Sequence, residues 1–216
     1  MSKYLETSEY DDFLNSVMSS KKFLKLARKN LHYWKWFAVS IHNALQAGMV
    51  CHLSGSAGLG ANDMRRVKEQ LEWHERDRKG EIEKEVVGRD EFDLPVFQVK
   101  NPKDCYPDDR LADPKTLLNR MGKQAKRVEH GAGSIIPISQ KHLKSWASIC
   151  SLRNNFVHFS PSGWLIEVDL IKIHSRELID IIQCIIDDGY AVRHAKPKRI
   201  KKAKKSLDVM ERILSK

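Results

Sequence analysis

Apolar residues recur at intervals of three and four positions along much of the chain, and this spacing is the strongest constraint on what it can fold into. One long stripe, within a helix expected over about residues 22–53, contains Leu31, Trp34, Phe37, Ala38, Ile41, Leu45 and Met49. Similar patterns predict helices from Ser8 through Met18, from Asp113 through Met121 and from Arg176 through Tyr190. The 216 residues are 41% hydrophobic, which is enough to bury a core. The expected fold class is all-α, a bundle of about five helices.

A charged helical insertion is expected over about residues 55–133. Residues 62–90 carry many charges of both signs and few apolar residues, which predicts an exposed helix interrupted near Gly80. Four prolines between positions 92 and 114 predict an irregular connection. Together these patterns predict one all-α domain over residues 1–192 that contains the insertion.

The excess of positive charge lies at the C-terminal end. The chain has 38 Lys and Arg against 28 Asp and Glu, a net charge of +10. Residues 193–216 hold ten basic and two acidic side chains (+8), which leaves +2 for the other 192 residues. We expect a basic tail that leads, after Pro197, into a short amphipathic helix. The tail either clamps a phosphate backbone, solubilises the protein or mediates dimerisation. The candidate nucleic-acid-binding residues are Lys196, Lys198, Arg199, Lys201, Lys202, Lys204 and Lys205.

Other motifs carry weaker signals. The glycine-rich residues 54–60 follow a helix and lack the GK[ST] of a phosphate loop, so they are interpreted as a helix stop. Glu72, His74 and Glu75 lack metal-ligand spacing, and neither metal nor cofactor is expected. The four cysteines are widely spaced and are interpreted as reduced. No apolar run is long enough to span a membrane and no signal peptide is evident, so a cytoplasmic location is expected.

The residues with the clearest chemical potential lie in the helix predicted from Ser139. Its apolar residues cover so much of its surface that it is expected to be central to the core. Arg153, Asn154 and His158 interrupt that surface, and Asn154 and His158 share one face at i, i+4 spacing. An Arg suits a phosphate, and a His can take or give a proton near neutral pH. This set is sufficient for RNA cleavage without a metal ion.

The sequence LRNNFVHF, residues 152–159, resembles the signature of the HEPN superfamily, an Arg and a polar residue followed by a His near the end of a bundle helix. Members are compact all-α domains, commonly dimeric, and many are metal-independent endoribonucleases of toxin, phage-defence or RNA-processing systems. The resemblance implies that Arg153 and His158 are catalytic and Asn154 supports them, in a cleft formed between two subunits. It implies RNA as substrate and leaves room for an antitoxin or other protein partner.

Two other interpretations remain open. Arg153 and Asn154 could hydrogen-bond loop carbonyls while His158 caps the helix, which would make the motif structural. Alternatively, the protein is a non-catalytic helical module that binds RNA or a protein through its charged helix and basic tail.

Overall fold

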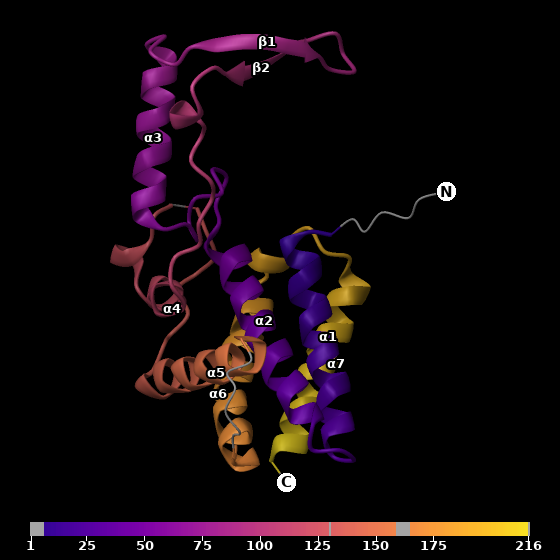
Figure 1. The fold of residues 1–216 in the computed structure, drawn as a ribbon. Helices are drawn as coiled ribbons and strands as arrows, with labels where there is room; N and C mark the ends of the chain where they lie inside the picture. The colour runs from indigo at the N-terminus through magenta and orange to yellow at the C-terminus, as the bar shows by residue number, and fades with distance from the viewer. Residues whose placement is uncertain (1–6, 130, 159–164, 216) are drawn as a thin grey trace. The chain divides into compact units, whose positions relative to one another are not determined.

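The computed structural model describes residues 7–129, 131–158 and 165–215 (Figure 1). The chain divides into two compact units, one formed by Met1–Ala61 with Asp113–Lys216 and the other by Asn62–Ala112. Helices dominate the described residues, and strands form only one two-stranded sheet there. The predicted all-α class is confirmed.

Helix α2 (Tyr33–Leu53) is the centre of the first unit, because α1 (Glu9–Ala27), α4 (Pro114–Gly122), α5 (Gln140–His158) and α6 (Val168–Asp188) all pack against it. Its buried residues lie around much of its circumference and include Phe37, Ile41 and Leu45. Gly48 allows α1 to approach closely, since a Cβ there would lie 2.8 Å from Cε2 of Phe13. Helix α2 therefore occupies the central position that the sequence pattern assigned to α5.

The prediction of one helix over 22–53 was wrong, because the chain turns between α1 and α2. Ser8 caps α1 as expected, its side chain accepting a hydrogen bond from the amide of Asp11. The helix ends at Ala27, and Asn30 then accepts two hydrogen bonds, at its side chain from the His32 amide and at its carbonyl from the Tyr33 amide. The turn reverses the chain so that α1 and α2 pack along their lengths.

The predicted basic tail, residues 193–216, is described as far as residue 215, and this part does not trail from the bundle or contain only a short helix. Helix α7 (Pro197–Leu214) is 18 residues long and packs against α1 and α6. Its buried side includes Ala203, Leu207, Met210 and Leu214, so this helix completes the core of the first unit. The lysines occupy the remaining faces, which explains how a strongly basic segment can also be a structural one.

The predicted insertion is wider than the second compact unit. Asp113 caps α4 through hydrogen bonds from the amides of Lys115 and Thr116, as the Asp-Pro sequence predicted. Leu117, Leu118 and Met121 are buried in the first unit. Residues 113–122 therefore belong to the helical bundle.

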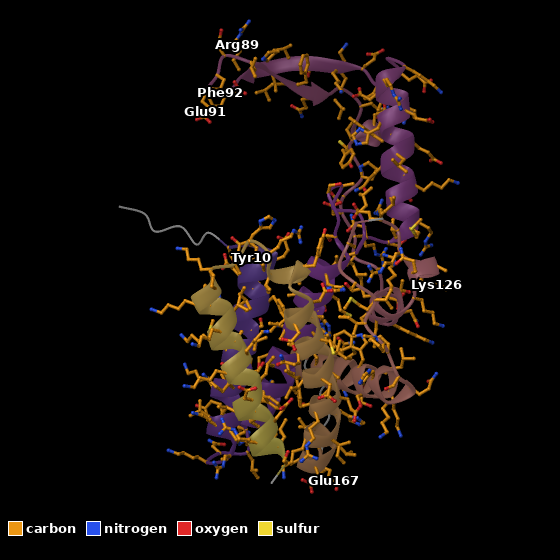
Figure 2. The ribbon with its side chains drawn as sticks, turned by 180° about the vertical axis from the view of Figure 1, so that it is seen from behind. Tyr10, Arg89, Glu91, Phe92, Lys126 and Glu167 are labelled. Atoms are coloured by element: carbon orange, nitrogen blue, oxygen red, sulfur yellow. The ribbon has the colours of Figure 1, made fainter. Side chains whose placement is uncertain are left out.

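The second unit contains helix α3 (Met64–Arg78) and an antiparallel hairpin of β1 (Lys84–Arg89) and β2 (Pro95–Val99). The helix expected beyond Gly80 and the irregular connection after it are thus largely a hairpin, with a register irregularity between Val86 and Gly88. Figure 2 shows Arg89, Glu91 and Phe92 at its tip. Both strands are exposed almost throughout, so their sequences lack the alternation that marks a half-buried strand.

A short 3-10 helix, η1 (Pro102–Asp104), returns the chain to α3 within this unit. The indole nitrogen of Trp73 donates a hydrogen bond of 2.6 Å to the Asp104 carbonyl, and Arg76 forms an ion pair with the Asp104 carboxylate at 2.7 Å. Polar contacts therefore contribute much of the tertiary structure of this unit.

No helix in the described ranges is both long and apolar enough to cross a membrane.

Candidate functional site

The three predicted site residues occupy the last turns of α5. Asn154 and His158 are exposed and Arg153 is half-buried. The buried face of α5 consists instead of Ser145, Trp146, Ile149 and Phe156, while Val157 is 41% exposed. The expected burial of the motif is therefore wrong for Asn154 and His158, which need no buried partner to offset desolvation. Phe159, the last residue of the LRNNFVHF sequence, lies outside the described residues.

Arg153 and Asn154 are directly linked. Nη1 of Arg153 donates a hydrogen bond of 3.1 Å to Oδ1 of Asn154. Nε of Arg153 is buried and has no hydrogen-bond partner among the described residues. Because this N–H is shielded from solvent, an anion could reach it only after a local rearrangement of the side chains around it. The arrangement orients the guanidinium while leaving it capable of binding an anion.

His42 of α2, which the sequence analysis did not single out, lies in the electrostatic field of Arg153. It is 4% exposed, and its ring stacks on Trp146 with centroids 4.8 Å apart. Burial lowers the pKa of His42 to about 4, and the positive charge of Arg153 contributes to the decrease, while a hydrogen bond with Asn43 opposes it. His42 is therefore neutral at pH 7. The residue spacing within α5 could not predict that His42 lies near Arg153, because His42 belongs to another helix.

Cys150 precedes Arg153 by nearly one helical turn. Burial raises the pKa of its thiol to about 12, and the charge of Arg153 only partly opposes this increase. Cys150 is therefore a thiol at neutral pH, and a thiolate nucleophile at this position is not favoured.

A cationic and aromatic group borders the same region of α2 and α5. Nζ of Lys35 lies 5.9 Å from the ring centroid of Phe156 and 5.4 Å from that of Trp36, which is 49% exposed. Stacking surfaces beside cations are common where single-stranded RNA binds. Sequence reasoning did not identify Lys35 or Trp36, although their position next to each other in α2 was a possible signal.

The seven predicted nucleic-acid-binding residues, which lie in α7 and at its N-cap, fall into two groups. Arg199 forms an ion pair with Asp11 of α1 and donates to Asn15 at 3.0 Å, and Lys204 forms an ion pair of 2.5 Å with Asp187 of α6. These two hold α7 to its neighbours. The other five predicted nucleic-acid-binding residues are exposed: Lys196, Lys198, Lys201, Lys202 and Lys205. Figure 2 shows basic side chains projecting outward along the length of this helix.

A group of possible metal ligands lies between α5 and α6. Ligand atoms of His142, Glu177 and Asp180 all lie within 4.8 Å of one another, and Nε2 of His142 is 3.7 Å from a Glu177 carboxylate oxygen. The amide of Ser139, however, donates to Nδ1 of His142 at 3.2 Å, so the ring proton belongs on Nε2. A neutral imidazole arranged this way offers no lone pair toward the carboxylates. The group is better explained as a polar contact between two helices.

Backbone amides of the glycine-rich loop after α2 form an anion cradle, and the anion that they bind is a carboxylate of the same chain. The carboxylate of Glu129 accepts hydrogen bonds from the amides of Gly55, Ala57 and Gly60 at 3.1, 2.9 and 2.5 Å. A Cβ on Gly60 would lie 1.8 Å from the Leu53 carbonyl oxygen, so this close turn requires glycine. The loop thus ends α2, as expected, and also anchors the segment around Glu129.

Comparisons with protein-family models, with curated proteins and with solved structures found no match to this chain. The chemistry of the α5 motif therefore depends on its own residues and their surroundings.

Proposed function

We propose that this protein is a metal-independent endoribonuclease of the HEPN type, acting as a cytoplasmic homodimer in a toxin, defence or RNA-processing system. The observation that carries the proposal is the end of α5, where the Arg153–Asn154 hydrogen bond lies one turn before an exposed His158. These residues combine an oriented phosphate-binding group with a side chain suited to proton transfer.

The reaction assigned to this site is an internal transesterification. The ribose 2′-oxygen forms a bond to phosphorus and the bond from phosphorus to the 5′-oxygen breaks, which yields a 2′,3′-cyclic phosphate and a 5′-hydroxyl. One proton leaves the 2′-hydroxyl and one joins the departing oxygen. His158 either accepts the first proton or supplies the second. Water, or His158 of a second subunit, performs the other transfer.

Arg153 stabilises the negative charge that develops on the phosphate oxygens in the transition state. Asn154 acts through Arg153 by holding its guanidinium, so it is a positioning residue. Because His42 is neutral at pH 7, it places no like charge beside Arg153.

Substrate chemistry provides the direct test of this reaction. Purified protein should cleave an RNA oligonucleotide in excess EDTA and release fragments with 2′,3′-cyclic phosphate ends. The same oligonucleotide with 2′-O-methyl groups at every position should remain intact, because it has no 2′-hydroxyl to attack phosphorus. Absence of RNA cleavage, or equal cleavage of the methylated strand, would refute the proposal.

A non-catalytic module that binds RNA is the second candidate, and the exposed lysines of α7 favour it. It predicts salt-sensitive RNA binding without cleavage. The substrate experiment separates the two candidates, because a binding module would leave both oligonucleotides intact.

A further inference from the structure

Helices α1 and α7 run side by side and in the same direction, and both contribute cations to the seam between them. Arg199, near the start of α7, contacts Asp11 and Asn15, near the start of α1. At the opposite ends, Lys25 and Arg28 line a groove with Arg212 of α7. Figure 1 shows this parallel arrangement, with α1 in indigo beside α7 in yellow. Cations separated widely in the sequence therefore lie along one seam.

The middle of the seam brings together lysines from both helices. Partial burial lowers the pKa of Lys21, and the charges of Lys25, Lys202 and Lys205 lower it further. Mutual repulsion among like charges is unfavourable in the isolated protein and is relieved when an anion binds. The contrast with Arg199 and Lys204 is clear, since those two are neutralised by carboxylates of neighbouring helices.

The groove at the end of the seam has a volume of about 700 Å³ and is lined by Lys25, Arg28, Val209, Glu211, Arg212, Ile213 and Ser215. We call the groove and the middle of the seam together the cationic trough. Its charged members are six cations and one carboxylate: Lys21, Lys25, Arg28, Lys202, Lys205, Arg212 and Glu211. Burial raises the pKa of the Glu211 carboxyl, and the charges of Asp180 on α6 and of the exposed Asp208 on α7 raise it further, so these two acids also lie near the trough. Cations nevertheless dominate the trough.

We propose that the cationic trough binds one strand of an RNA phosphate backbone. Two adjacent helices lie roughly 8–10 Å apart, so their cations can flank a single strand from both sides. The seven residue steps from Lys21 in α1 to its C-cap, Arg28, extend over about 10 Å, which allows more than one phosphate to be contacted. The choice of RNA among polyanions rests on the proposed function, whereas the trough itself does not depend on catalysis at α5.

The arrangement of α7 favours a polyanion in water over a lipid surface. A helix that lies on a membrane inserts its apolar face among the lipids. The apolar face of α7 is already buried within the bundle, with Leu207, Met210 and Leu214 all fully buried. Val209 and Ile213 are half-buried in the groove, and the exposed side chains of α7 are mainly charged, which suits the salt-sensitive recognition of phosphates.

The test measures binding of a fluorescent 20-nucleotide RNA whose 2′-oxygens are all methylated, so that cleavage plays no part. The trough variant carries Lys25→Gln, Arg28→Gln, Lys202→Gln and Lys205→Gln. A matched control carries Lys115→Gln, Lys123→Gln, Lys126→Gln and Lys141→Gln, four exposed residues that lie outside the trough and lower the net charge equally. Each protein is titrated over a range of salt concentrations.

We plot the logarithm of the association constant for RNA against the logarithm of the salt concentration. In the trough variant the slope should become less negative by roughly 3, since four contacts with a single strand are lost. The control variant should retain the wild-type slope. Equal changes in both variants, or no binding by the wild type, would overturn the trough as a binding site. So would a trough variant that binds RNA normally yet loses binding to vesicles containing phosphatidylserine, an outcome that would assign the trough to lipid headgroups.

This measurement is independent of the proposed function. Trough-dependent binding by a protein that cleaves no RNA would refute the nuclease and leave the trough intact. Cleavage of unmodified RNA together with equal binding changes in both variants would refute the trough alone.

Discussion

Nη1 of Arg153 and Oδ1 of Asn154 are joined by a hydrogen bond of 3.1 Å between consecutive residues of α5. Consecutive residues of a helix point about 100° apart, so such a bond requires the long Arg side chain to bend toward its neighbour. The bond uses one guanidinium donor and orients the others. We therefore expect the contribution of Asn154 to RNA cleavage to depend on Arg153.

Substitution of the two linked residues should separate orientation from charge. Asn154→Ala should lower kcat about tenfold while KM changes little, since the guanidinium remains but is held less firmly. Arg153→Lys retains the charge without the planar fork and should lower kcat by roughly 10² or more. Steady-state kinetics measures both effects, and Asn155→Ala, at an exposed neighbouring position, is the control. A change in KM alone would contradict the assigned roles.

His42 makes stability depend on pH. Its pKa is about 4 in the folded protein and near 6.5 when unfolded, so protons favour the unfolded state between these values. The contribution of neutral His42 to the free energy of unfolding is fully present above pH 6.5. It is lost as the pH falls toward 4, which lowers the free energy of unfolding by about 3 kcal/mol. His52, whose pKa is also lowered by burial, acts in the same direction.

The His42→Phe variant should keep the ring stack on Trp146 and remove this titration. We expect its unfolding free energy, from urea titrations at pH 7.5 and pH 5, to fall less on acidification than that of the wild type. His32→Gln, at an exposed position, should behave as the wild type does. Parallel curves for His42→Phe and the wild type would refute the buried neutral state of His42.

The cradle around Glu129 should stabilise the first unit. Glu129→Gln preserves the shape of the side chain but replaces one acceptor oxygen with a donor, so at least one of the three amides loses its partner. We expect a loss of about 1–2 kcal/mol of unfolding free energy. Glu91→Gln, at the exposed hairpin tip labelled in Figure 2, should have little effect. Equal thermal stability of the two variants would show that the cradle is not important for folding.

Helix α7 should behave as part of the core. Leu207 is fully buried and the next residue, Asp208, is exposed, which provides adjacent test positions. Leu207→Ala should cost about 2–5 kcal/mol and Asp208→Ala no more than about 0.5 kcal/mol in urea unfolding. Similar small effects at both positions would indicate a detachable tail. If α7 is structural, charge substitutions are better tests of RNA binding than deletion of residues 193–216.

Helical periodicity correctly predicted the class and several helices of the first unit, because one-sided burial leaves a local signature in residues such as Phe13, Val17 and Leu178. The hairpin left no such signature, since Val86 and Phe97 pair across the strands but both remain exposed. The turn at Asn30 was missed because apolar residues continue at helical spacing on both sides of it.

The candidate site was predictable only within α5. The sequence placed Arg153, Asn154 and His158 on one helix end, but the neighbours that determine their environment come from elsewhere in the chain. His42 approaches from α2, and the lysines of α1 reach those of α7 through packing of two helices at opposite ends of the sequence. Such proximity depends on tertiary contacts, which residue spacing does not encode.

The most direct test of the account is the single-turnover rate of RNA cleavage by the wild type, His158→Ala and the control His32→Ala in excess EDTA. Both histidines are exposed, but His32 precedes α2, whereas His158 completes the α5 motif. We predict cleavage by the wild type and the control at equal rates, and a decrease of about 10²–10⁴-fold for His158→Ala. Absence of cleavage by the wild type, or an undiminished rate for His158→Ala, would contradict the account.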